Sequence, residues 1–76
     1  MTIAERQKIM KQLGYYQGDI DGIDGFETRR ATVAFKMANG LDPRPIVGPV
    51  AVTLLRSLAE RVTAAMENDG GFAKTG

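Results

Sequence analysis

Four glycines, at positions 14, 18, 22 and 25, fall within thirteen residues that separate two helix-like segments. Glycine is costly inside a helix or strand, so this spacing predicts a loop with a demanding backbone shape. Gly14 follows an apolar helical stripe, where a left-handed glycine ends a helix. Asp21-Gly22 and Asp24-Gly25 are typical turn dipeptides. We name residues 13–25 the corner, and we expect Gly14, Gly18, Gly22 and Gly25 to shape it.

One helix is predicted on each side of the corner, and a third after a proline-rich loop. Thr2 and Glu5 have the spacing of a capping box, which predicts a helix from about residue 3 to residue 13. The second helix should run over residues 26–39. The third should open at Pro49, after the structural Gly48, and fray after Met66. The predicted buried faces contain Ile3, Ile9, Met10 and Leu13, then Thr28, Ala31, Val33, Phe35, Met37 and Ala38, then Leu54, Leu55, Leu58, Val62 and Ala65.

The fold class predicted from this pattern is all-α, a compact three-helix bundle with ordered glycine-rich loops. Ile20 and Ile23 are expected to pin the corner to the core. The segment 42–45 contains two prolines and cannot continue a helix. Ile46 and Val47 follow it, and a very short two-stranded ribbon with Ile20 is one option for them. Residues 1–66 would form the domain, and residues 67–76 a flexible tail or the start of a linker.

Length and composition exclude several classes of function. A chain of 76 residues forms one small domain, whose core supplies roughly 3–5 kcal/mol. The chain has no cysteine and no histidine, which removes the commonest general base and zinc ligand. A net charge of +1 argues against nucleic acid as a partner. No apolar run is long enough to span a membrane, and no signal peptide is visible. We expect a monomer.

The carboxylates of the corner do not form a recognisable metal or catalytic site. Counted from Asp19, the fifth position of a calcium loop is Ile23 and the twelfth is Arg30 instead of glutamate. A glycosidase needs two carboxyl groups across a walled cleft, which a chain this small does not offer. Ser57 has no histidine to activate it. We therefore predict no metal, no cofactor and no catalysis, and we interpret the aspartates as turn caps.

Two other groups of side chains leave alternatives open. Tyr15 and Tyr16 point in different directions, so one ring can fill the edge of the core while the other is a platform for a sugar face or a peptide. The alternative is that both rings pack over the helix junction. Four basic residues of the second helix and the proline-rich loop could form a basic patch, namely Arg29, Arg30, Lys36 and Arg44. We interpret them instead as a solvated face. A DNA reader would need more positive charge.

The motif residues also match a known pattern. They are Gln7-x-x-Met10-x-x-Leu13-Gly14-Tyr15-Tyr16-x-Gly18-x-Ile20-Asp21-Gly22-x-x-Gly25-x-x-Thr28-x-x-Ala31-x-x-x-Phe35, then Gly40-Leu41, Val47-Gly48-Pro49 and Leu55. This run closely resembles the peptidoglycan-binding-like domain, a three-helix module attached to bacterial and phage cell-wall hydrolases. The resemblance covers about residues 7–58.

The resemblance implies a non-catalytic module that acts at the bacterial cell wall and concentrates a linked hydrolase on its polymer. The sequence departs from the family at Lys36, where glutamine is usual, at residues 42–45, where an Asp-Gly turn is usual, and at Ala51, where threonine is usual. These departures affect the loop before the third helix and leave the corner intact.

On this basis the ligand is peptidoglycan, either its glycan or its stem peptide, held at the corner and the start of the second helix. The predicted contacts are Tyr16, Gln17, Asp19, Asp21, Asp24, Glu27 and Arg30. A start at Met1 and a glycine-rich end fit an N-terminal module followed by a catalytic domain, as in a phage endolysin. The alternative is a protein-docking or assembly module that kept the fold and lost the polymer.

Overall fold

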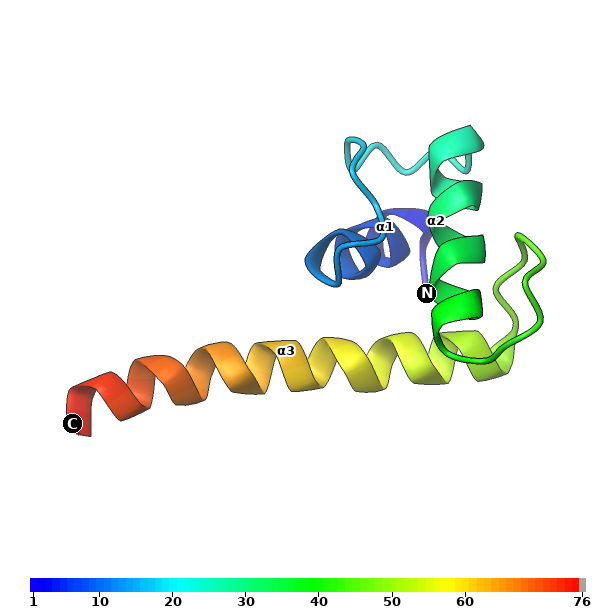
Figure 1. The fold of residues 1–76 in the computed structure, drawn as a ribbon. Coiled ribbons are helices and arrows are strands. Elements are labelled where there is room, and N and C mark those ends of the chain that lie inside the picture. Colours follow the sequence, from blue (N-terminus) through cyan, green and yellow to red (C-terminus); the bar gives the residue numbers. More distant parts are fainter. Residues whose placement is uncertain (76) are drawn as a thin grey trace.

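Residues 1–75 form three helices, as the sequence predicts. In the computed structural model, the backbone is described for residues 1–75 and the side chains for residues 1–64. The helices are α1 (Ile3–Gln12), α2 (Phe26–Ala38) and α3 (Pro49–Thr75) (Figure 1). Residues 1–75 contain no strand, so the all-α class is confirmed and the optional ribbon of Ile46 and Val47 with Ile20 does not form.

The two ends of α1 follow the local signals in the sequence. The Thr2 hydroxyl accepts a hydrogen bond from the Glu5 amide at 3.1 Å, and the Glu5 carboxylate accepts from the Thr2 amide, which completes the predicted capping box. At the other end, Gly14 has a φ of +91°. The Tyr15 amide donates to the Met10 carbonyl at 2.8 Å, and the Gly14 amide donates to the Lys11 carbonyl at 3.2 Å. These are the two bonds of a Schellman motif.

The end of α2 has the same motif as the end of α1, whereas α3 begins at a proline. Gly40 has a φ of +70°, and the Leu41 amide reaches back to the Lys36 carbonyl at 2.8 Å. Pro49 is the first residue of α3, where its missing N–H is not needed, and the Gly48 carbonyl accepts the first helical bond from Val52. Gly48 is therefore the residue that directly precedes α3 and accepts its first helical bond.

The structure extends α3 to Thr75, beyond the end predicted near Met66. The assignment of residues 67–76 to a tail or linker stays a prediction, and the side chain of Ala65 lies outside the described residues. None of the helices in the described part of the chain is long and apolar enough to cross a membrane.

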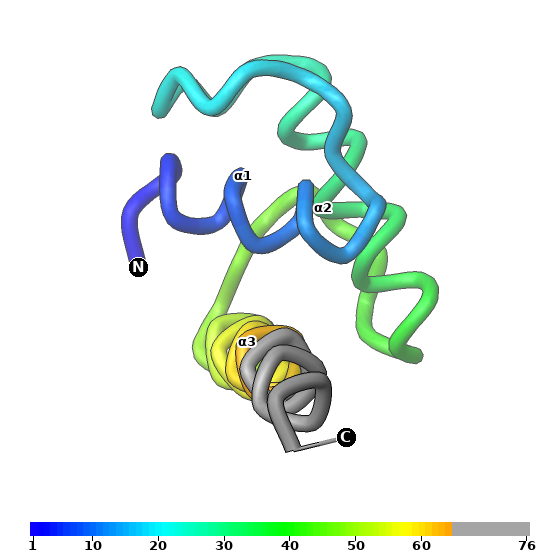
Figure 2. Tube along the Cα trace, turned by 90° about the vertical axis from the view of Figure 1, so that its left-hand side faces the viewer, coloured from blue at the N-terminus to red at the C-terminus, as the bar shows by residue number. Residues whose placement is uncertain are grey.

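Each helix contributes one large, fully buried apolar side chain to a single core. These are Met10 from α1, Phe35 from α2 and Leu55 from α3, all 0% exposed. Tyr16, Ala31 and Ala51 complete the buried cluster. Figures 1 and 2 show α3 on one side of the molecule, with α1 between it and the corner. The corner is therefore held on the far side of α1 from α3.

The buried face of α2 differs from the predicted one at four positions. Met37 and Ala38, which were expected in the core, are exposed, whereas Thr32 and Lys36 are buried. Lys36 is buried because the proline-rich loop folds back beside α2, and its ammonium group donates to the Arg44 carbonyl at 3.1 Å. The interpretation of Lys36 as part of a solvated face was therefore wrong, since helical periodicity does not show where a following loop packs.

Candidate functional site

A buried glutamine on α1 holds the corner in place. Gln7 is 0% exposed, and its side-chain NH₂ group lies 2.8 Å from the Thr28 hydroxyl, 3.0 Å from the Asp21 carboxylate and 3.0 Å from the Ile23 carbonyl. Its carbonyl oxygen accepts from the Gly22 amide at 2.9 Å. An amide carries only two hydrogens, so these acceptors share them. One side chain thus joins α1, the corner and the start of α2.

This network replaces the apolar anchoring that the sequence suggested. Ile20 and Ile23 are 47% and 64% exposed, so they do not pin the corner to the core. Gly22, with a φ of +74°, is left-handed as predicted. Gly25 is not: its φ is −91°, and it caps α2 instead of forming a left-handed turn. The corner is therefore shaped by polar bonds to Gln7 more than by apolar contacts.

Tyr16 belongs to the core and not to the ligand surface. Its side chain is 4% exposed, and its hydroxyl donates to the Asp19 carbonyl at 2.5 Å and lies 3.3 Å from the Gln7 amide. A ring buried in this way has no face on which a sugar or peptide can stack. The role predicted for Tyr16 as a ligand contact therefore does not fit the structure, although the expectation that one ring of the pair enters the core does.

The neighbouring Tyr15 takes the surface position. Its ring packs edge-on against Phe35, with ring centroids 5.8 Å apart and an interplanar angle of 77°, and it stays partly exposed. It lines a groove of about 330 Å³ between the start of the corner and α2. The lining residues are Tyr15, Gln17, Glu27, Arg30 and Ala34. The structure thus brings together Gln17, Glu27 and Arg30 of the predicted contacts.

The three aspartates among the predicted contacts do not line this groove. The Asp21 carboxylate accepts from the Ile23 amide at 2.9 Å and from Gln7. Asp24 lies 3.4 Å from the Arg6 guanidinium and 3.9 Å from that of Arg29. Asp19 is exposed, and its carbonyl accepts the Tyr16 hydroxyl. Asp21 therefore caps a turn, as the sequence predicts, whereas the side chain of Asp24 makes ion pairs instead.

The hydrogen bonds to Asp21 predict a dependence of stability on pH. The bond from the Ile23 amide, followed by that from the Gln7 side chain, lowers the pKa of Asp21. The folded pKa is then below the unfolded value of about 3.9, so the stabilisation is complete above that value and is lost as pH falls through the folded pKa. In Asp21→Asn, which does not titrate, this contribution should be missing at neutral pH. Urea midpoints measured between about pH 6 and about pH 2 should converge for the two proteins at the acidic end.

Only the difference between the two proteins is diagnostic, because a hydrogen bond from Arg44 also lowers the pKa of Asp42. That second contribution is present in both proteins and cancels in the comparison. A gap between wild type and Asp21→Asn that stays constant across the pH range would show that the Asp21 charge does not stabilise the corner.

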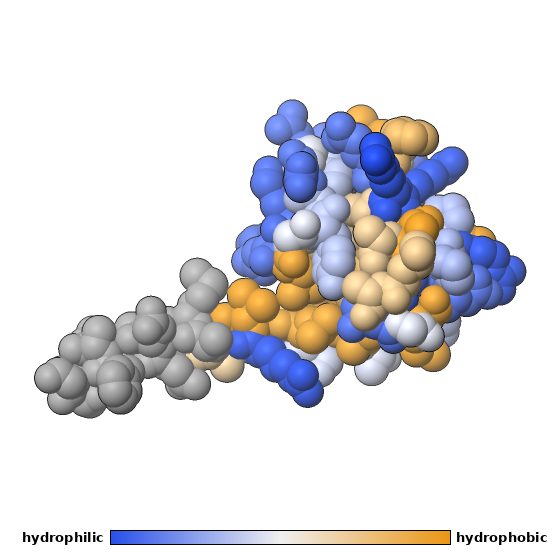
Figure 3. Space-filling view, in the orientation of Figure 1, coloured by the Kyte–Doolittle hydropathy of each residue, from blue (hydrophilic) through white to orange (hydrophobic). Residues whose placement is uncertain are grey.

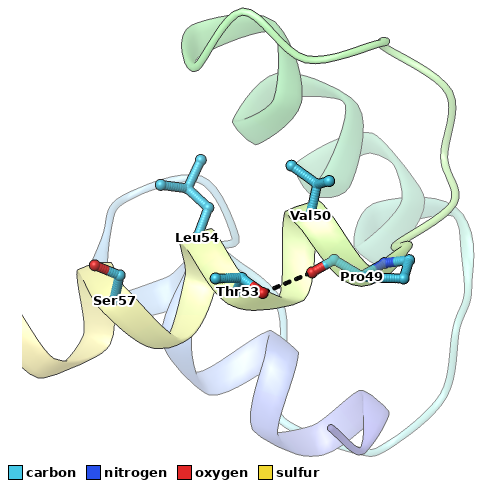
Figure 4. Close-up of a pocket in the computed structure, with 5 residues that line it drawn as sticks. All are labelled: Pro49, Val50, Thr53, Leu54 and Ser57. Carbon is cyan, nitrogen blue, oxygen red and sulfur yellow. Dashed lines mark hydrogen bonds between the residues drawn. The ribbon is translucent and has the colours of Figure 1, made fainter.

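Another hollow, of about 470 Å³, lies on α3 and is mainly apolar, unlike the corner groove. Val50 and Leu54 form its apolar wall, and the Thr53 hydroxyl is already bonded to the Pro49 carbonyl at 2.9 Å (Figure 4). Figure 3 shows hydrophobic residues along the described part of α3 and mainly hydrophilic residues on the corner side. The polymer of sugars and peptides that the sequence resemblance implies would need polar partners, so the smaller corner groove is the better candidate site.

Sequence reasoning missed two residues that matter here, Gln7 as the anchor and Tyr15 as the exposed ring. A signal for Gln7 was present: it falls on the same helical face as Ile3 and Met10, and a polar residue on an apolar face must find partners. No comparable signal distinguishes Tyr15 from Tyr16, because that choice depends on where Gln7 and Asp19 lie in space.

A comparison with known families assigns the chain to one of them. The family model described as "Putative peptidoglycan binding domain" matches residues 2–55, which include α1, the corner, α2 and the first turns of α3. Searches of curated proteins and of solved structures gave no match. Since the matched segment is well over half of the 76 residues, the chain belongs to the peptidoglycan-binding domain family.

Proposed function

We propose that this chain is a non-catalytic module that binds peptidoglycan in the corner groove and keeps a linked cell-wall hydrolase, such as an endolysin, close to its substrate. The observation that carries the proposal is the groove itself: in a chain of this family, Tyr15, Gln17, Glu27 and Arg30 line one concave surface. It combines part of an aromatic ring with amide and charged groups, the mixture that polar polymers require.

A shallow groove is sufficient for this role. Its volume of about 330 Å³ is at the lower end of the range for small-molecule pockets, so one repeat of the polymer would be held weakly. A targeting module needs only modest affinity, because the covalent link raises the effective concentration of the catalytic domain at the wall.

The test is binding to purified insoluble peptidoglycan. The wild-type chain should be depleted from solution, and Ala34→Arg should lose at least about tenfold in affinity because the long side chain fills the groove. Ala38→Arg is the matched control: it adds the same side chain to an exposed position of α2 outside the groove, and it should bind like wild type. No depletion of wild type, or equal depletion of both variants, would reject the groove as the binding site.

The alternative is a protein-docking module on the same fold. The observation in its favour is the apolar surface of Val50, Leu54 and their neighbours on α3, which has little polar character. If soluble muropeptides cause no amide chemical-shift changes, while a stable protein complex is lost in Val50→Asp, this alternative replaces the first proposal.

A further inference from the structure

We infer that the groove selects the charged stem peptide of peptidoglycan and not its glycan strand. This inference rests on the proposed function and concerns the chemical class of ligand at that same site. It is carried by two opposite charges, Glu27 and Arg30, that line the groove together.

These two charges are available to a ligand. Among the described side chains, Asp24 pairs with Arg6 and Arg29, and Asp42 pairs with Arg44 at 2.7 Å, whereas no ion pair within 4.0 Å involves Glu27 or Arg30. Residues three apart on a helix are neighbours, with Cβ atoms about 5–6 Å apart. The groove therefore presents an anion and a cation about one helical turn apart.

The Glu27 carboxylate lies close to the corner. A Cβ atom on Gly18 would collide with the Glu27 carboxylate as well as with the Tyr16 ring, so the carboxylate lies directly over the Gly18 backbone. Arg30 lies one turn further along α2. Its planar guanidinium can bind a carboxylate with two parallel hydrogen bonds, the strong form of this interaction.

The two polymer components differ in the chemistry that fits this arrangement. Glycan strands present hydroxyl and acetamido groups, and their lactyl carboxyl is consumed by the link to the peptide. Stem peptides carry free carboxylates and, where a diamino acid is not cross-linked, a free amine. A carboxylate at Arg30 and an amine near Glu27 would complement both charges of the groove.

An adjoining apolar surface fits the same ligand. Arg30 also borders another hollow, which is neither the corner groove nor the hollow on α3. It has a volume of about 370 Å³ and is lined by Phe26, Arg29, Arg30, Val33 and Pro45. Phe26 is 78% exposed there. A peptide whose carboxylate binds Arg30 would have this apolar wall available for alanine methyl groups. Arg30 thus lines both a polar subsite and an apolar one.

The experiment is a titration of the full 76-residue chain, followed by amide chemical shifts, with three soluble probes. They are a disaccharide-tetrapeptide muropeptide, the peptide-free disaccharide with its lactyl carboxyl amidated, and the same muropeptide with its carboxylates amidated. Of the three probes, only the unmodified muropeptide should bind, and high salt should weaken its binding.

Two variants test the charges of the groove. Arg30→Gln should bind the muropeptide at least about tenfold more weakly, the loss expected for a charge-assisted bond. Glu27→Gln should bind muropeptides that carry a free amine more weakly. Arg56→Gln and Glu60→Gln, exposed on α3, are matched controls that should bind like wild type.

The outcomes separate this inference from the proposed function. If the peptide-free disaccharide binds as well as the muropeptide, or if Arg30→Gln has no effect, the stem-peptide inference is overturned while groove-dependent binding to insoluble peptidoglycan still supports the proposed function. If the wild-type chain binds neither insoluble peptidoglycan nor the muropeptide, both are overturned.

Discussion

Replacing Gln7 with leucine is expected to remove most of the domain's stability. The substitution leaves the Gly22 amide, the Thr28 hydroxyl and the Asp21 carboxylate without their shared partner. Each unsatisfied buried group costs about 1–3 kcal/mol, and solvent can reach some of them in the corner, so we expect a total loss of about 3 kcal/mol. A domain of this size has only roughly 3–5 kcal/mol to lose. Urea unfolding followed by far-ultraviolet circular dichroism measures the change.

The chain provides a matched control for this experiment. Gln12 lies on the same helix but is exposed, so Gln12→Leu should change the free energy of unfolding by no more than about 0.5 kcal/mol. Gln7→Glu keeps the shape and the acceptor oxygen but loses the donor hydrogens and places a second negative charge beside Asp21. It should be destabilised as well. Equal midpoints for Gln7→Leu and Gln12→Leu would show that the amide network does not hold the corner.

The second large effect is expected for Gly18→Ala. An added Cβ would lie 2.7 Å from the Tyr16 hydroxyl oxygen and 2.8 Å from its ring, besides the clash with Glu27. The Tyr16 side chain is buried and bonded, so it cannot move aside without disturbing the core. Overpacking of this kind costs typically 1–3 kcal/mol, and we expect about 2 kcal/mol. The same variant should also weaken binding, because it displaces the Glu27 carboxylate.

Gly25→Ala and Gly48→Ala are the appropriate comparisons for Gly18→Ala. Nothing lies within 4 Å of a Cβ added at either position, so these variants should lose only the advantage of glycine over alanine at a helix N-cap, roughly 0.5–1 kcal/mol. If Gly18→Ala unfolds at the same urea concentration as these two variants, the tight contact between the corner and Tyr16 is not a source of stability.

The parts of the fold that depend on neighbouring residues could be predicted from the sequence. The capping box of Thr2 and Glu5, the left-handed Gly14 and the proline that opens α3 are all as expected. Each of these signals acts within about one helical turn, so the residues alone determine it. The burial of Met10, Phe35 and Leu55 was also predicted correctly, because helical periodicity places these residues on the inner faces of their helices.

The candidate site is formed by contacts between residues that are distant in sequence, and fewer of its residues were predicted correctly. Which tyrosine enters the core is decided by Gln7, nine residues away, and Lys36 is covered by a loop that follows it in the chain. The aspartates were grouped with the groove because they are close in sequence. In space, Asp21 turns toward Gln7 and Asp24 toward Arg6. Of the predicted contacts, only Gln17, Glu27 and Arg30 line the same groove.

The glutamine that fastens the corner carries no net charge, and this has a consequence for work at the cell surface. An ion pair in its place would loosen as ionic strength rises, since mobile ions screen exposed charges over about 10 Å at 0.1 M. A buried neutral amide is not screened in this way and does not titrate. The contacts of Gln7 with Gly22, Ile23 and Thr28 should therefore persist in media whose salinity varies widely, whereas the ion pair between Arg6 and Asp24 should weaken as salt rises.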